Sequence, residues 1–417
     1  MQRDLTARAV LIGTAALILT PLAAAAQEGG GLRFTLGIEE RIEAIRNPDL
    51  DIPATGTTTS ATTRLSFGMV SETAIQTFSL NAAAGVRIAN EPADGTTTEL
   101  EAPSLSVNYQ RAVSNAALTF GINFRRDRID TLDASDFPDD LPDDLADLDG
   151  TGTREDLTAQ ASLAWGMDAP LGVTLTATAG KTTYTDASDP DLIDNTRYGL
   201  TALTRMRFSP VLDGTVLLSH SVEDEDVVGG VRTETQSLRF GLDYALSPAA
   251  QMKASLGLSQ SDENGVDSDG ISASAGYTQE LASGQFGAEI GVVKGEDDTA
   301  LTGRLDWRQD FATSQFSASL LREASTDATD ITTTARVGYD YEINDVSGLS
   351  LGVALSQIDE AGENAVQRTD LTASYRRALT EDWNMDFGVN HRIRDEETVG
   401  TTSSQAIFVA LRRDFEW

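Results

Sequence analysis

Histidine and serine are the residues of this sequence that could supply a nucleophile and its general base. The 417-residue chain has two histidines, His220 and His391, and no cysteine. Ser219 and Ser221 flank His220, but neighbouring residues of an extended strand point to opposite faces of a sheet. The hydroxyls therefore point away from the imidazole, so the contact that activates a serine is missing. We predict that the chain is not an enzyme.

Carboxylates offer a second kind of chemistry, the binding of cations. The segment 127–153 contains ten aspartates. Asp147 and Asp149 precede Gly150 with a spacing like part of a calcium loop, but the bidentate glutamate of such loops is missing. Diffuse enrichment of cations is the alternative. We expect no cofactor, with Ca²⁺ at Asp147 and Asp149 as the one candidate metal.

The elements that position these residues have the pattern of β-strands. Apolar and polar residues alternate along runs of about ten to fourteen residues, and the runs repeat over nearly the whole chain after residue 31. One such run has Val337, Tyr339, Tyr341 and Ile343 on one face. A soluble β-sandwich also has alternating strands, so the alternation alone does not decide the fold class.

The end of the chain carries the clearest alternating run. In the last twelve residues, AIFVALRRDFEW, one face carries Ile407, Val409, Leu411, Arg413, Phe415 and Trp417. A terminal aromatic on an alternating strand resembles the signal by which Gram-negative outer-membrane barrels are recognised for assembly. That resemblance implies that Phe415 and Trp417 form an assembly signal, read by the barrel assembly machinery through the C-terminal strand.

The connections between the runs favour a membrane barrel over a sandwich. Short turns such as 247–250 and 344–346 alternate with longer loops such as 46–60, 127–153, 186–195 and 261–269. Short turns on one side and longer loops on the other are typical of membrane barrels. We predict an all-β, transmembrane, antiparallel up-and-down barrel of about 20 strands, with 18 as the alternative, short periplasmic turns and acidic extracellular loops.

Aromatic residues on the apolar face support the same fold. They gather beside the short turns, where rings suit a membrane–water interface. A soluble core would not confine its rings to one end. The predicted girdle consists of Tyr109, Trp165, Phe208, Tyr244, Tyr277, Phe286, Phe311, Phe316, Tyr341, Tyr375, Trp383, Phe415 and Trp417.

The first residues have the composition of a targeting segment. Arg3 and Arg8 flank a basic region, an apolar run follows, and small residues precede Gln27. We expect a cleaved signal peptide at residues 1–26 and the barrel at 27–417. Only about five residues then precede the first strand, which disfavours a plugged active transporter.

The loop 127–153 resembles the constriction loop of classical porins in its position after the fifth strand, its length and its acidity. This resemblance implies that the loop folds into the lumen, whereas an acidic surface loop is the alternative. The residues that would face the pore are Asp133, Asp136, Asp139, Asp140, Asp143 and Asp144.

Arginines on the polar face of the strands could provide counter-charges. Mixed rings of charge produce a selectivity filter, although such residues also pair across neighbouring strands. The predicted basic wall of the lumen consists of Arg205, Arg207, Arg239, Arg304, Arg308 and Arg336.

The charge balance limits the partners. Lys plus Arg is 31 and Asp plus Glu is 65, a formal net charge of -34. Nucleic acid is therefore not an expected partner. We predict a cation-preferring outer-membrane porin for small hydrophilic solutes, surrounded by membrane lipid and lipopolysaccharide. A structural, adhesive or polysaccharide-export barrel is the alternative, and both a homotrimer and a monomer fit the sequence.

Overall fold

The computed structural model describes residues 31–50, 52–92, 95–129, 132, 151–189, 192–227, 229–296, 298–359, 365–396 and 400–417. These residues form one antiparallel sheet of twenty strands. The first ten are β1 (Leu32–Arg46), β2 (Thr57–Glu72), β3 (Gln76–Glu91), β4 (Gly95–Val113), β5 (Ala116–Arg128), β6 (Thr153–Trp165), β7 (Leu171–Thr185), β8 (Asn195–Ser209), β9 (Leu212–Glu225) and β10 (Val231–Ser247). The others are β11 (Ala250–Glu263), β12 (Val266–Leu281), β13 (Gly284–Lys294), β14 (Thr299–Asp310), β15 (Ser314–Ala324), β16 (Ile331–Asn344), β17 (Ser347–Asp359), β18 (Val366–Ala378), β19 (Trp383–Glu396) and β20 (Gly400–Glu416).

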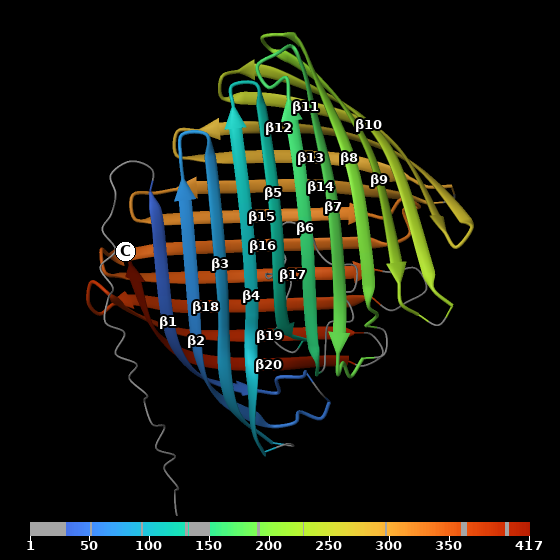
Figure 1. The fold of residues 1–417 in the computed structure, drawn as a ribbon. Coiled ribbons are helices and arrows are strands. Elements are labelled where there is room, and N and C mark those ends of the chain that lie inside the picture. Colours follow the sequence, from blue (N-terminus) through green and yellow to red (C-terminus); the bar gives the residue numbers. More distant parts are fainter. Residues whose placement is uncertain are drawn as a thin grey trace, which may run out of the picture.

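The sheet is closed into a barrel. Each strand pairs with its neighbours in sequence, and β1 also pairs with β20, from Thr35 opposite Glu416 to Arg46 opposite Gln405. Closure leaves no free edge, as a bilayer core requires of a β-protein. In Figure 1, β20 ends beside β1, and the strands of the second half cross behind those of the first. The prediction of an up-and-down barrel with 20 strands is confirmed.

The two ends of the barrel differ in their connections. At the end that holds the start of β1 and the end of β20, the turn end, the connections have two to five residues. At the opposite end, the loop end, they range from two residues (264–265) to 24 (129–152). The predicted loop 261–269 is wrong in extent, because β11 and β12 continue to a two-residue hairpin at Asn264 and Gly265, which both have positive φ.

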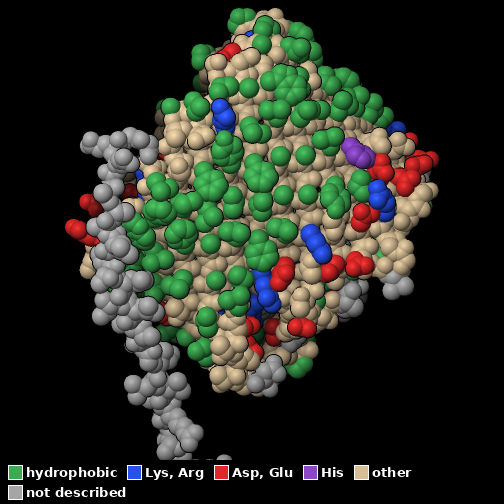
Figure 2. Space-filling model, viewed as in Figure 1, with side chains coloured by type: hydrophobic (Ala, Val, Ile, Leu, Met, Phe, Trp, Pro, Cys, Tyr) green, Lys and Arg blue, Asp and Glu red, His purple; other side chains and the backbone are tan. Residues whose placement is uncertain are grey.

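The outer face of the barrel is apolar and the inner face is polar. Phe34 stacks with Trp417, with 6.3 Å between ring centroids, and lies 6.2 Å from Phe67. Ile42 has the same parity as Phe34 on β1 and is 64% exposed. Figure 2 shows apolar side chains across the middle of the wall and charged ones gathered towards the loop end. This inversion of the usual soluble pattern is that of a lipid-facing barrel.

The aromatic residues expected in a girdle lie near the turn end, as predicted. Trp307 and Phe316 meet edge to face with 5.1 Å between centroids, and Phe208 covers Gly214. The described residues contain no helix that is long and apolar enough to cross a membrane. The predicted signal peptide, residues 1–26, lies outside the described residues.

Candidate functional site

The candidate site is the inner face of the barrel, and its turn-side half is open to water. Arginines there pair with an acid two residues further along the same strand. Arg304 Nε lies 2.7 Å from Asp306 Oδ2, and both side chains are about half exposed, at 59% and 48%. The equivalent distance from Arg412 to Asp414 is 2.9 Å. Exposed ion pairs of this kind contribute little to stability. Because they are exposed, they give this half of the inner face a hydrated lining of mixed charge.

All six arginines of the predicted basic wall have inward-facing parity. Arg304 is paired as above, Arg308 lies 3.3 Å from Asp310, and Arg207 lies 3.7 Å from Asp213. Arg336 has an interaction partner as well. At least three of the six arginines thus have an acid beside them, so the wall is not an uninterrupted basic surface. Arg239 Nε lies near Gly257, whose missing Cβ leaves room for the hydroxyl of Ser272.

Arg205 has a structural role that its position on the wall did not reveal. Its Nη2 donates to the carbonyl oxygens of Gly166, Met167 and Ala169 at 3.3, 2.6 and 3.4 Å. These three carbonyls belong to the connection between β6 and β7. The guanidinium of Arg205 on β8 thus stabilises the neighbouring turn, because it has several N–H donors that can bind several carbonyls at once.

Several charged side chains in the loop-side half of the inner face are buried. Arg87 on β3, Arg154 on β6 and Arg368 on β18 are each no more than 6% exposed, and so is Asp370 beside Arg368. The ring of Tyr184 lies 5.9 Å from the guanidinium carbon of Arg154. Charged groups are rarely buried without partners, and Arg154, Arg368 and Asp370 all have them.

An apolar cluster crosses the lumen at the loop end. Ile129 and Leu132 follow β5, and Leu192 precedes β8. Ile358 is the last residue but one of β17, and Val366 is the first residue of β18. Ile129 is 1% exposed and Leu132 is 4% exposed. Neither β17 nor β18 is paired with any strand from β5 to β8, so the contact joins separate parts of the wall. The cluster narrows the loop end of the lumen.

A second connection leans over the inner face at β12. In the segment 325–330, between β15 and β16, Asp327 Oδ1 accepts from the hydroxyls of Ser325 and Thr329 at 2.5 and 2.9 Å. Burial alone would raise the pKa of Asp327, but these hydrogen bonds outweigh it and hold the pKa below its ordinary value. The backbone of the segment packs on Gly270 and Gly295, whose missing Cβ atoms permit the approach.

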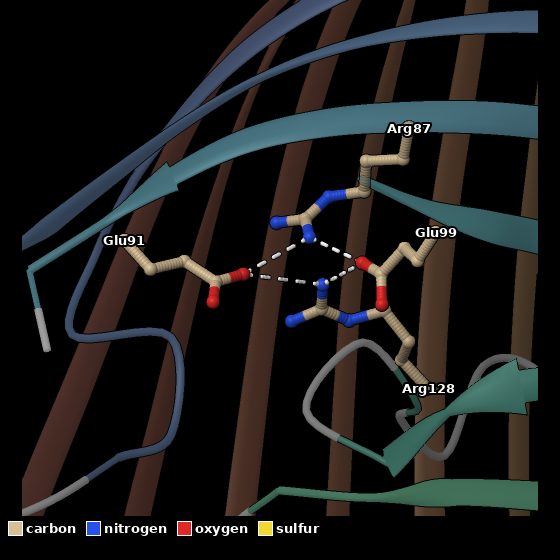
Figure 3. A network of polar contacts seen from close by, with 4 residues as sticks. All are labelled: Arg87, Glu91, Glu99 and Arg128. Carbon is tan, nitrogen blue, oxygen red and sulfur yellow. Dashed lines mark hydrogen bonds and ion pairs between the residues drawn. The ribbon is translucent and has the colours of Figure 1, made fainter. Parts of the chain in front are cut away.

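A four-residue ion network lies where β4 separates from β5 (Figure 3). The backbone pairing of β4 with β5 stops at Ser104 opposite Arg125. Beyond it, Arg87 Nη1 lies 2.5 Å from Glu99 and 3.2 Å from Glu91, while Arg128 Nη1 lies 2.6 and 3.7 Å from the same two acids. Side chains thus hold β3, β4 and β5 together where the backbone ladder ends.

The acidic residues expected at a constriction lie outside the described residues. These are Asp133, Asp136, Asp139, Asp140, Asp143 and Asp144, together with the calcium candidates Asp147 and Asp149. In the part of the chain that the structure describes, no group of three or more His, Cys, Asp or Glu side chains could hold a metal ion.

The two histidines do not lie in the lumen. His220 has the parity of Leu218 on the outer face, and its Nδ1 is 3.8 Å from Glu234. His391 Nδ1 lies 3.1 Å from the carbonyl oxygen of Ser404. Ser219 faces inward, where its hydroxyl bonds to Ser237 at 2.6 Å. The geometry holds no nucleophile–base contact at either histidine.

Solved structures resemble this barrel. A mutant of the ferric enterobactin receptor PfeA from Pseudomonas aeruginosa has a TM-score of 0.51 and 11% identity, over 93% of this chain and 81% of that one. The fold is that of an outer-membrane β-barrel. The siderophore receptor PirA of the same organism gives a TM-score of 0.48 at 12% identity, with coverages of 94% and 81%. Its OccK5 (OpdH) gives 0.38 at 14% identity, with coverages of 92% and 98%.

No protein-family model and no curated protein matches the chain. At such low identity the structural similarity shows a shared fold and identifies neither a substrate nor a partner of this chain. The functional inference therefore depends on the chemistry of the inner and outer faces of this barrel.

The apolar cluster is the part of the site that the sequence reading missed. A signal for it was present, because Ile129 and Ile358 are large apolar residues on a face that is otherwise polar. An apolar side chain on the wet face of a barrel strand marks a place that another segment covers. The same signal picks out Ile45 on β1, which is buried on the inner face.

Proposed function

We propose that this barrel is a passive diffusion channel of the outer membrane for small hydrophilic solutes. The single observation that carries the proposal is the contrast between the apolar outer face and the turn-side inner face, where Arg304 and Asp306 are half exposed. Arg207, Asp213, Asp243 and Gln251 also line a hollow at this end. Wet, charged side chains inside a lipid-facing wall support a water-filled lumen.

Hydroxyl side chains line the sector from β9 to β12. Ser219 bonds to Ser237 at 2.6 Å, and Ser255 bonds to Ser274 at 2.8 Å. These side chains are short and uncharged, so they leave space for water and offer hydrogen bonds to solutes of either charge. This lining supports a general diffusion path over a binding site for one ligand.

The loop end should set the size limit of the path. The cluster around Ile129 and Ile358 and the loop at Asp327 both narrow the lumen there. We therefore expect a conductance that is small for a wall of twenty strands. Acids outnumber bases in the chain by 65 to 31, and many lie near the loop end, which favours cations at low salt.

Conductance of the refolded, full-length protein in planar bilayers tests this function. A KCl gradient should give stepwise currents with a cation-selective reversal potential, and the selectivity should weaken as the salt concentration rises. Anion-selective currents at low salt would reject the cation preference, and a lack of conductance from inserted, folded barrels would reject the channel.

The same narrowing supports a second candidate, a structural, adhesive or polysaccharide-export barrel without general pore activity. The buried Arg154 and Arg368 are what a lumen filled at its loop end would contain. Zero conductance together with binding of the folded barrel to capsular or cellulose-type polysaccharide would favour this candidate over the channel.

Two further partners belong to the proposal. Lys181 and Lys294 face outward near the loop end, where phosphates of lipopolysaccharide would lie. The C-terminal strand β20 is the element that the assembly machinery would read, with Phe415 and Trp417 at its end.

A further inference from the structure

One carboxylate lies on the outer face of the barrel at the depth of the apolar belt. Glu40 has the parity of Phe34 and Ile38 on β1 and is exposed. Thr63 on β2, directly opposite in the register, donates its hydroxyl to Glu40 at 2.9 and 3.0 Å. Among the described strands, every other outward-facing acid lies within four residues of the loop end of its strand, where water is near. Glu40 lies well inside the belt.

A single cation lies next to Glu40 on this part of the outer face. Arg413 of β20 is opposite Ile38, and Glu40 is opposite Leu411, so the two charges are two residues apart across the contact of β1 with β20. The guanidinium of Arg413 lies 4.5 Å from the ring of Phe415, and one of its nitrogens lies 3.1 Å from Asp382. A guanidinium has five donors, so several of them stay available to a further acceptor.

Lipid acyl chains alone do not stabilise this pair of charges. An exposed carboxylate at the depth of the acyl chains costs free energy that a hydrogen bond from one threonine does not offset. A cation supplied by a second protein would offset it, because a paired charge in a medium of low dielectric constant is strongly stabilised. The outer face around Glu40 therefore has the chemistry of a protein interface.

We propose that the outer face formed by β20, β1 and β2 is the two-fold interface of a homodimer, in which Glu40 of each copy pairs with Arg413 of the other. An isologous contact brings residue i against residue j and residue j against residue i. Because Glu40 and Arg413 lie on adjacent strands, two ion pairs would form across the axis, each between Glu40 of one copy and Arg413 of the other. Ile42, Leu65 and Val409, which are exposed on the same face, supply the apolar surface around the charges.

The position of the charges favours two copies over three. In a cyclic trimer, each copy presents two different faces to its neighbours, so an acid and its basic partner would lie on separate parts of the barrel. Here they are on adjacent strands. The two-fold axis would pass between Glu40 and Arg413, close to Ile38 and Leu411.

Cysteine crosslinking in native membranes tests the interface, because the chain has no cysteine of its own. Ile38→Cys should form a disulfide-linked dimer upon oxidation. The matched control is Ala275→Cys, which is exposed on the outer face of β12 and should remain monomeric. In the Ile38→Cys protein, Glu40→Arg or Arg413→Glu should each lower the crosslinked fraction about tenfold or more, and the double exchange should restore it.

Each alternative has a distinct outcome. No crosslink through Ile38→Cys in a folded barrel overturns the interface, and a native mass of three copies for the folded protein in detergent overturns the dimer. A crosslink that is indifferent to Glu40→Arg overturns the ion pair. If the double exchange restores thermal stability but gives no crosslink, Glu40 and Arg413 pair within one copy and the proposal is wrong. Channel currents do not enter these readouts, so the proposed function is tested separately.

Discussion

Phe408 of β20 lies inside the barrel over Gly388 of the neighbouring strand β19. A Cβ atom on Gly388 would lie 2.5 Å from two carbons of the Phe408 ring, so the glycine provides the space that the ring occupies. The guanidinium of Arg41 covers the ring at 3.8 Å and pairs with Glu43 at 2.7 Å. This stack joins β19, β20 and β1, so it stabilises the contact that closes the barrel.

Gly388→Ala should therefore destabilise the barrel. The added methyl group forces the Phe408 ring out of its place, and overpacking of this kind costs about 1–3 kcal/mol. The control is Gly180→Ala on the inner face of β7, where a Cβ atom meets nothing closer than 3.9 Å. Urea unfolding followed by tryptophan fluorescence measures both variants. Equal stability of the two would mean that the Phe408 stack is not under packing constraint.

Because Arg87 belongs to the four-residue network, its side chain should contribute more to the free energy of unfolding than an exposed arginine does. Arg87→Met removes the buried arginine of the network and leaves Glu91 and Glu99 with Arg128 alone, so the free energy of unfolding should fall by about 2 kcal/mol. Arg304→Met breaks an exposed pair and should cost less than about 1 kcal/mol. The midpoint of the heat-dependent shift in gel mobility should fall clearly in the first variant only.

The apolar cluster at the loop end should limit the current through the lumen. Ile358→Asn places an amide among Ile129, Leu192 and Val366, which weakens the contact across the lumen. We expect a larger single-channel conductance and a lower unfolding midpoint. Leu203→Asn, on the inner face of β8 and outside the cluster, is the control and should leave the conductance unchanged. Unchanged current in Ile358→Asn would show that the narrowest point lies elsewhere.

The sequence predicted the outer face of the barrel better than its interior. The period-two pattern of β16 or β20 follows from the pleat, and each strand that faces lipid repeats it, so the fold and the girdle could be predicted. Ile129 and Ile358 are inward-facing apolar residues that mark covered positions, but their contact with Leu192 could not be predicted, because the cluster joins segments far apart in the chain. The network at Arg87 was missed for a different reason, since it depends on the bulge at Ala102, where φ is +41°.

Acid should release the loop between β15 and β16. The folded-state pKa of Asp327 lies below its ordinary value of 3.8, so the stabilisation by this carboxylate is complete at neutral pH. It is lost as the pH falls from the ordinary value through the depressed folded-state value. Amide exchange at Ala328, which is buried, should therefore accelerate at pH 3 relative to pH 6 after correction for the intrinsic rate.

Asp327→Asn gives the control for this effect. The variant cannot ionise, so its loop should exchange faster than the wild type at pH 6, and the remaining change with pH should be smaller. A wild-type loop that stays protected at pH 3 as strongly as at pH 6 would contradict the role of the carboxylate.

The C-terminal aromatic is expected to act in assembly and to leave the pore unaffected. Trp417 and Phe34 exchange both backbone hydrogen bonds, at 3.0 and 3.2 Å, and their rings stack on the outer face, so neither reaches the lumen. Trp417→Ala should lower the yield of folded barrel in the outer membrane several-fold. Trp165→Ala removes a comparable exposed girdle ring from β6 and is the control, because it leaves the terminal strand intact. Barrels of Trp417→Ala that do assemble should conduct as the wild type does. Normal yield of this variant would reject the assembly signal, whereas equal losses in both variants would assign the effect to membrane anchoring by the girdle.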